Sequence, residues 1–156
     1  MSIGGKMEIE KIKLKQLKRY ENNAKIHTEE QIEHIINSIN KFGFNDPIAV
    51  WGEDNLIIEG DGRYLALNKM GIEEVEIIRL DHLTLGERKA YTLAHNQLNL
   101  ETGLDFEILD SELAELKDMN MDMSAFGFEL EDLEELDRAK VSRNEPTDYH
   151  QRIPRL

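Results

Sequence analysis

Apolar residues recur along the chain in two patterns, short runs bounded by turn residues and longer stretches with helical spacing. Short runs predict buried or half-buried strands, and apolar positions three and four residues apart predict amphipathic helices. Strands are predicted at residues 7–17, 47–51, 56–59 and 75–80. Helices are predicted at residues 28–42, 63–70, 85–98, 105–116 and 129–138. The alternation predicts an α/β (α+β) domain over residues 7–100, with a small mixed sheet and flanking helices.

Three of these helices carry recognisable start signals. Thr28 with Gln31, and Thr84 with Glu87, have the spacing of a capping box, in which each residue bonds a backbone N–H of the other. Asp105 precedes a third helix as an N-cap. The first strand is rich in lysine, which favours a position at the edge of the sheet.

The part of the chain beyond residue 100 has a different character. We expect an acidic helical extension at 101–140 and, where periodicity ends, a flexible tail at 141–156. The net charge of the chain is -13, and residues 101–156 hold sixteen acidic and six basic side chains. Such a segment repels DNA phosphates and suits a basic partner or solubility. In one interpretation it docks a partner protein or a second copy of the chain through Leu130, Leu133 and Leu136.

Composition excludes several classes of function. The sequence has no cysteine, which excludes disulfides, thiolate metal sites and cysteine catalysis. No apolar run approaches the roughly 20 residues that span a membrane, and no signal peptide is visible, so we expect a cytoplasmic protein. The five histidines lack the spacing of a zinc site, and we predict no dedicated metal centre. A chain of 156 residues suffices for one domain with an appendage.

Residues 56–71 hold the main candidate for chemistry. The apolar run 56–58 predicts a strand, Gly60-Asp61-Gly62 a turn, and the following residues a helix. A strand, a glycine turn and a helix N-terminus together point backbone N–H groups at an anion. Arg63 could add its planar donors, and Glu59 and Asp61 could handle a proton or a metal ion. The alternative is an ordinary connection with Asp61 as the N-cap.

Residues 59–66, Glu-Gly-Asp-Gly-Arg-Tyr-Leu-Ala, resemble the central box of the ParB/sulfiredoxin superfamily. In that superfamily a Gly-x-x-Arg turn after a strand binds nucleotide phosphates. The form with small residues around the arginine is typical of ParB-like domains in phage genomes and beside DNA methyltransferases. The loop 22–25 resembles a loop that faces the nucleotide in phage members. Residues 94–98 resemble a closing signature, Ala-Asp-Asn-Arg/Lys-Leu, with Asn96 in place.

The resemblance implies a binding site for a nucleotide or phosphate. Its residues are Gly60, Asp61, Gly62, Arg63, Asn23, Lys25 and Asn96. The expected ligand is ATP, ADP or CTP, with magnesium if the chain is catalytic. The expected setting is phage or plasmid DNA metabolism, with a DNA-modification or partitioning protein or a second copy of the chain as partner. Gln97 departs from the signature, since a basic residue is expected there.

The resemblance leaves the activity open. Sulfiredoxin needs a cysteine at the position of Asp61, so that activity is excluded. A nucleotide hydrolase or phosphotransferase and a ParB-like nuclease both stay open, with Glu59 and Asp61 as the catalytic carboxylates. In the nuclease these two would hold a divalent metal that activates water. The basic residues are concentrated between 6 and 25, and this is a small patch against the net charge of -13. We therefore predict weak or no direct binding to DNA by the protein alone.

Overall fold

The computed structural model describes residues 7–23 and 25–128. The chain divides into two compact units, one formed by residues up to Leu93 and the other by residues from Ala94. Among the described residues, no helix has both the length and the apolar character that crossing a membrane requires.

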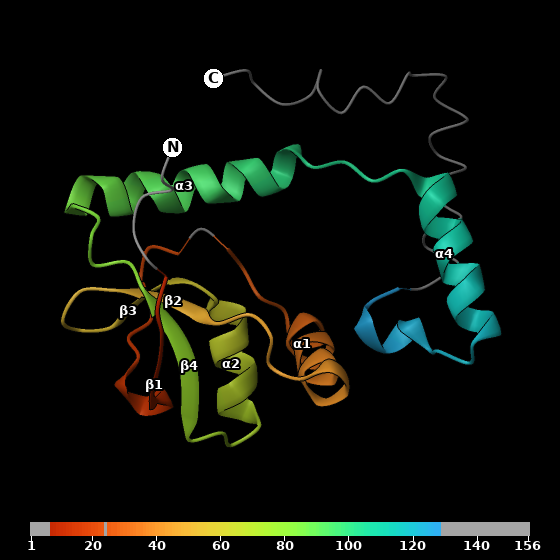
Figure 1. The fold of residues 1–156 in the computed structure, drawn as a ribbon, viewed down its shortest axis with the longest axis horizontal. Coiled ribbons are helices and arrows are strands. Elements are labelled where there is room, and N and C mark those ends of the chain that lie inside the picture. The colour runs from red at the N-terminus through yellow and green to blue at the C-terminus, as the bar shows by residue number, and fades with distance from the viewer. Residues whose placement is uncertain (1–6, 24, 129–156) are drawn as a thin grey trace. The chain divides into compact units, whose positions relative to one another are not determined.

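The first unit is built on a four-stranded mixed sheet with the order β1-β4-β2-β3 (Figure 1). The strands are β1 (Ile9–Lys13), β2 (Ile48–Trp51), β3 (Leu56–Glu59) and β4 (Glu74–Arg79). β4 pairs antiparallel with β1 and parallel with β2, while β2 and β3 form an antiparallel hairpin. The predicted mixed sheet and the edge position of β1 are therefore confirmed.

One face of the sheet forms the hydrophobic core. Ile48, Val50 and Ile77 are fully buried on it, and Leu67 of α2 (Asp61–Lys69) packs against them. Each such side chain stabilises the fold by roughly 1.5–3 kcal/mol relative to full exposure. The helix α1 (Glu29–Phe42) packs beside α2. As predicted, α1 begins after the cap Thr28, whose side chain accepts a hydrogen bond from the Gln31 backbone N–H.

The predicted first strand is too long. β1 ends at Lys13, and a short 3-10 helix, Leu14–Gln16, replaces the rest of the predicted 7–17 strand. Leu14 and Leu17 are 4% and 7% exposed, so both side chains turn into the core instead of alternating across a sheet. The Leu14 N–H donates to the carbonyl of Glu73 at 2.8 Å, which fixes this change of direction.

The first half of α3 (Leu85–Glu101) belongs to the first unit and lies beyond the end of β2. Trp51 is the last residue of β2, and its indole Nε1 donates to the carbonyl of Leu83 at 2.9 Å. The predicted capping box at Thr84 is confirmed, since Thr84 and Glu87 each bond the backbone N–H of the other. This hydrogen bonding fixes the place where α3 begins.

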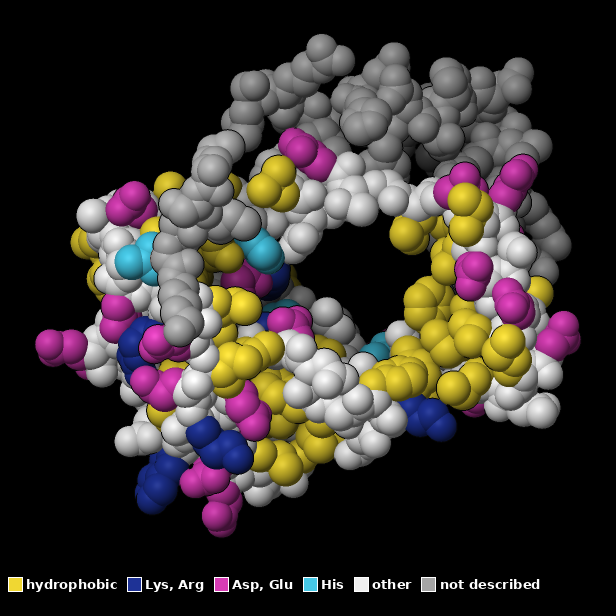
Figure 2. Space-filling model, viewed as in Figure 1, with side chains coloured by type: hydrophobic (Ala, Val, Ile, Leu, Met, Phe, Trp, Pro, Cys, Tyr) yellow, Lys and Arg dark blue, Asp and Glu magenta, His cyan; other side chains and the backbone are white. Residues whose placement is uncertain are grey.

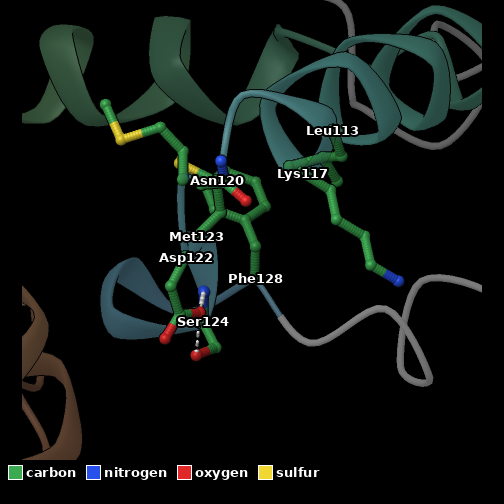
Figure 3. A pocket seen from close by; sticks show the side chains of 8 residues that line it. Leu113, Lys117, Asn120, Asp122, Met123, Ser124 and Phe128 are labelled. Atoms are coloured by element: carbon green, nitrogen blue, oxygen red, sulfur yellow. Dashed lines mark hydrogen bonds between the residues drawn. The ribbon is translucent and has the colours of Figure 1, made fainter.

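The second unit contains α4 (Phe106–Asp118), which begins after the predicted cap Asp105. The segment 119–127, which follows α4, contains a short 3-10 helix, Met123–Phe126. Asp122 caps this helix, accepting from the backbone N–H of Ser124 at 3.0 Å. A pocket of about 420 Å3 lies between α4 and this turn (Figure 3). The predicted helix at 129–138 with Leu130, Leu133 and Leu136, and the predicted tail at 141–156, lie outside the described residues.

Candidate functional site

The chain turns from β3 into α2 at Gly60. Its φ of 109° and ψ of 23° place it in the left-handed region, where glycine is favoured because it has no Cβ. A Cβ at this position would also lie 2.9 Å from Nη2 of Arg63. Gly60 is the N-cap of α2, and Asp61 is the first residue of the helix rather than its cap. The predicted sequence of strand, glycine turn and helix is therefore present.

Gly62 allows a close approach of the segment that precedes α1. A Cβ on Gly62 would lie 3.0 Å from Cε1 of His27 and 3.0 Å from Cδ1 of Ile35. Real Cβ atoms rarely come so close to their neighbours, so no larger residue fits without a shift. The space that a side chain at position 62 would fill is occupied by His27 and Ile35.

Asp61 is held by partners from a distant part of the chain. Arg19 Nε donates to Oδ1 at 2.8 Å and Nη2 donates to Oδ2 at 2.9 Å, a bidentate arrangement. Asp61 is 8% exposed, and burial alone would raise the pKa of its carboxyl group. The bonds and charge of Arg19, with contributions from His27 and Asn23, outweigh burial and lower that pKa. Asp61 is therefore an ionised carboxylate that ties the 19–27 segment to the turn.

The ring of His27 lies beside the same carboxylate. Its Nδ1 is 2.8 Å from Oε1 of Gln31, a contact in which the ring N–H donates to the amide oxygen. Nε2 is 3.9 Å from Oδ2 of Asp61. Within the described parts of the chain, this buried nitrogen has no hydrogen-bond partner.

Glu59 joins the same loop to the end of β3. Lys25 Nζ lies 3.4 Å from Oε2 of Glu59, and the Lys25 backbone N–H donates to the Asn23 side chain at 3.1 Å. Burial, and then the charge of Glu59, raise the pKa of Tyr91 on α3. One side of the site, next to the end of β3, is therefore formed by Lys25, Glu59 and Tyr91.

Arg63 contacts the two residues that precede β2. Its Nη1 lies 3.0 Å from Oδ2 of Asp46, and its Nη2 donates to the carbonyl of Pro47 at 3.1 Å. The predicted phosphate donor therefore already has two acceptors. Among the residues that the structure describes, Nε of Arg63 is buried without a hydrogen-bond partner.

The structure brings most of the predicted site residues together in the first unit. These are Asn23, Lys25, Glu59, Gly60, Asp61, Gly62 and Arg63. Asn96 lies on the part of α3 that belongs to the second unit. Sequence reasoning missed Arg19 and His27, which are 42 and 34 positions away from Asp61 along the chain.

Both predicted catalytic carboxylates are paired with basic side chains. Both oxygens of Asp61 accept from Arg19, and Glu59 faces Lys25. In the described residues, no group of three or more His, Asp or Glu side chains is arranged to hold a metal ion. A divalent metal at Glu59 and Asp61 would first have to displace these cations, so the present geometry does not fit one.

Comparison with known proteins identifies the family. The sequence matches the ParB N-terminal domain over residues 3–96. This chain belongs to the ParB N-terminal domain family. A ParB-like relative is the ParB-like nuclease domain-containing protein YnaK of Escherichia coli (strain K12). It is 35% identical over 71 residues, which cover 46% of this chain and 80% of YnaK. The predicted ParB/sulfiredoxin resemblance is confirmed.

Two solved structures are similar to this chain, and the first of them carries the comparison of fold. The C-terminally truncated chromosome-partitioning protein ParB from Caulobacter crescentus aligns with a TM-score of 0.59 and 19% identity, covering 76% of this chain and 68% of that chain. Sulfiredoxin from Arabidopsis thaliana aligns with a TM-score of 0.45 and 20% identity, covering 55% of this chain and 97% of that chain. The predicted fold class is confirmed.

Proposed function

We propose that this ParB-domain protein binds the phosphate group of a nucleotide at the Gly60–Arg63 turn. One observation carries the proposal: Gly60, in the left-handed conformation, leads β3 directly into the N-terminus of α2. The first backbone N–H groups of a helix have no acceptor within the helix, and the helix dipole favours an anion at that end. Arg19, Lys25 and Arg63 place cationic groups around the same turn.

Each of these cations is already paired with a carboxylate. Arg19 bonds Asp61 and Arg63 bonds Asp46, whereas the Lys25–Glu59 separation of 3.4 Å is the longest of the three. The Lys25 side chain is 41% exposed, so its ammonium can turn to a ligand without unpacking the core. Lys25 is therefore the cation most easily redirected to a phosphate, and Arg63 is the second.

The expected ligands are ATP, ADP and CTP. The structure of the Caulobacter ParB is a complex with CTP-gamma-S, and its likeness to this chain is one of fold. The choice of nucleotide for this chain is therefore a matter for direct measurement. Phage or plasmid DNA metabolism, with a modification or partitioning protein as partner, is the setting that the ParB family suggests.

Isothermal titration calorimetry with ATP, ADP and CTP, with and without magnesium, tests the proposal. We expect one nucleotide to bind the wild type and to bind Lys25→Ala and Arg63→Ala about 10- to 100-fold more weakly. A lost charge-assisted hydrogen bond of about 1.5–3 kcal/mol has that effect. Lys11→Ala is the matched control, because Lys11 lies on β1 at the opposite edge of the sheet from β3.

Two results would contradict the proposal. Absence of heat with every nucleotide would favour an ordinary connection between β3 and α2. Wild-type affinity in both Lys25→Ala and Arg63→Ala would move the phosphate away from this turn. Circular dichroism of each variant is needed beside the titrations, because Arg63 also bonds the carbonyl of Pro47.

A further inference from the structure

Arg88 is a buried cation on the first half of α3, and the residue is 5% exposed. Its guanidinium carbon lies 5.1 Å from the ring centroid of Tyr20 and 5.2 Å from that of Trp51. Both distances are within the range of cation–π contacts. The two rings come from separate parts of the first unit, the segment after β1 and the end of β2.

The hydrogen-bonding groups of Arg88 are not satisfied. Its Nε and Nη1 are buried, and neither has a hydrogen-bond partner among the described residues. By contrast, Arg19, Arg63 and Arg79 each lie within 3.0 Å of a carboxylate oxygen. Aromatic rings stabilise a cation through their faces and supply no acceptor for N–H groups. A buried charge with unmet donors is costly for the folded state.

We infer that Arg88 binds an oxyanion, a phosphate or carboxylate group, at the edge of its guanidinium plane. The N–H donors of arginine lie in that plane and match two acceptor oxygens at once. The guanidinium carbon lies over the rings of Tyr20 and Trp51, and within the described residues Nε and Nη1 have no acceptor, so these donors are left for a ligand. The bidentate edges of the group are Nε with Nη2 and Nη1 with Nη2, so an oxyanion at either edge supplies an acceptor for one of the unpartnered nitrogens and the opposite charge that this arginine lacks.

The oxyanion reaches Arg88 from the side of Tyr20. Trp51 is fixed by its place in β2 and by its bond to the carbonyl of Leu83. Tyr20 instead lies in a part of the chain where none of the described residues 20–23 and 25–28 belongs to a helix or strand. This site uses residues other than those of the Gly60–Arg63 turn, so it goes beyond the proposed function.

The test compares the wild type with Arg88→Met. Methionine fills a similar volume and removes the unpaired charge, so without added anion the variant is expected to unfold at the same temperature as the wild type or higher. Thermal unfolding is followed against increasing inorganic phosphate, and separately acetate, at constant ionic strength set with chloride. Wild-type Tm should rise by several degrees with one of the two anions, because the ligand binds the folded state. A rise with phosphate indicates a ligand that carries a phosphate group, and a rise with acetate indicates a ligand that carries a carboxylate.

Matched variants locate the response. Arg88→Met should lose the anion-dependent rise in Tm, whereas Lys89→Met, which removes a charge from the exposed neighbouring residue, should keep it. Lys25→Ala should also keep it, which separates this site from the turn. No rise in the wild type with either anion would overturn the inference. So would an unchanged rise in Arg88→Met, or a rise lost in Lys25→Ala alone. If Arg88→Met does not fold, the wild-type titration and Arg88→Lys, expected to respond more weakly because its ammonium lacks the planar fork, decide the question.

Discussion

Asp61 is a buried carboxylate whose bonds to Arg19 join the segment after β1 to the turn between β3 and α2. Replacing it with asparagine keeps the shape and removes the charge that Arg19 binds. We expect Asp61→Asn to lower the free energy of unfolding at pH 7 by about 1.5–3 kcal/mol, the range for hydrogen bonds to charged groups. Urea denaturation measures this loss. Asp46→Asn is the control, because Asp46 is a 75% exposed partner of Arg63 and should change stability by no more than about 0.5 kcal/mol.

The same carboxylate predicts a pH dependence. The pKa of Asp61 is lowered in the folded protein, whereas an unfolded aspartate has a pKa of about 3.9. The unfolded state therefore binds this proton more tightly, and the contribution of Asp61 is present above about pH 4 and lost as the pH falls through the lowered folded value. The difference in stability between wild type and Asp61→Asn should shrink over that acidic range. A difference that stays constant would show that the Arg19 bond is not coupled to folding.

Among single residues, the turn itself was predictable and its partners were not. Gly60-Asp61-Gly62 is a local pattern, visible without knowledge of the fold. Arg19 reaches Asp61 because the chain at Lys18 runs beside Leu56 of β3, a pairing between distant residues. Arg88 appears in the sequence as one more polar residue of an amphipathic helix. Its burial depends on two rings that only the folded chain brings to it.

At the scale of elements, the start of α3 depends on a hydrogen-bonded cap. The Glu87 N–H donates to Oγ1 of Thr84 at 3.2 Å, and the Thr84 N–H donates to Oε1 of Glu87 at 2.9 Å. These bonds also lower the pKa of Glu87. We expect Thr84→Ala to destabilise the first unit by about 1 kcal/mol, the usual cost of losing an N-cap. Thermal or urea unfolding provides the measurement.

Thr92→Ala is the matched control on the same helix. Thr92 Oγ1 donates to the carbonyl of Arg88 at 3.2 Å, a bond within the helix that stabilises little. Alanine also has the higher helix propensity, so this variant should be neutral or slightly stabilised. If Thr84→Ala proved no less stable than Thr92→Ala, the capping box would not determine where α3 begins.

Local signals account for most of the elements. The caps Thr28, Thr84 and Asp105 fix three helix starts, and the apolar runs fix the strands, because both depend on neighbours in sequence. The order β1-β4-β2-β3 does not follow from such signals, since it depends on which apolar faces pack together. The end of β1 was predicted too late for the same reason. Leu14 belongs to the alternating pattern of a strand until the core turns its side chain inward.

At the scale of the whole molecule, charge governs the response to nucleic acid. The chain carries a net charge of -13, and residues 101–156 hold most of the excess of acidic side chains. On the visible face of the first unit, basic and acidic side chains are interspersed (Figure 2). Several cations are also paired with carboxylates, among them Lys11 with Glu76 and Lys69 with Glu33. Such pairs reduce the positive charge available to phosphates.

We therefore predict no measurable sequence-specific binding to duplex DNA at physiological salt. Binding to DNA requires several clustered cations that release counterions, and here Arg19, which belongs to the basic segment 6–25, is already bonded to Asp61. A mobility-shift assay over a range of salt concentrations provides the measurement, and tight sequence-selective binding would contradict the prediction.

The nuclease alternative has its own test, cleavage of plasmid or single-stranded DNA with magnesium or manganese. Cleavage lost in Glu59→Gln, a more conservative change than removing the bonded Asp61, would establish a metal-dependent nuclease and require Lys25 to move away from Glu59.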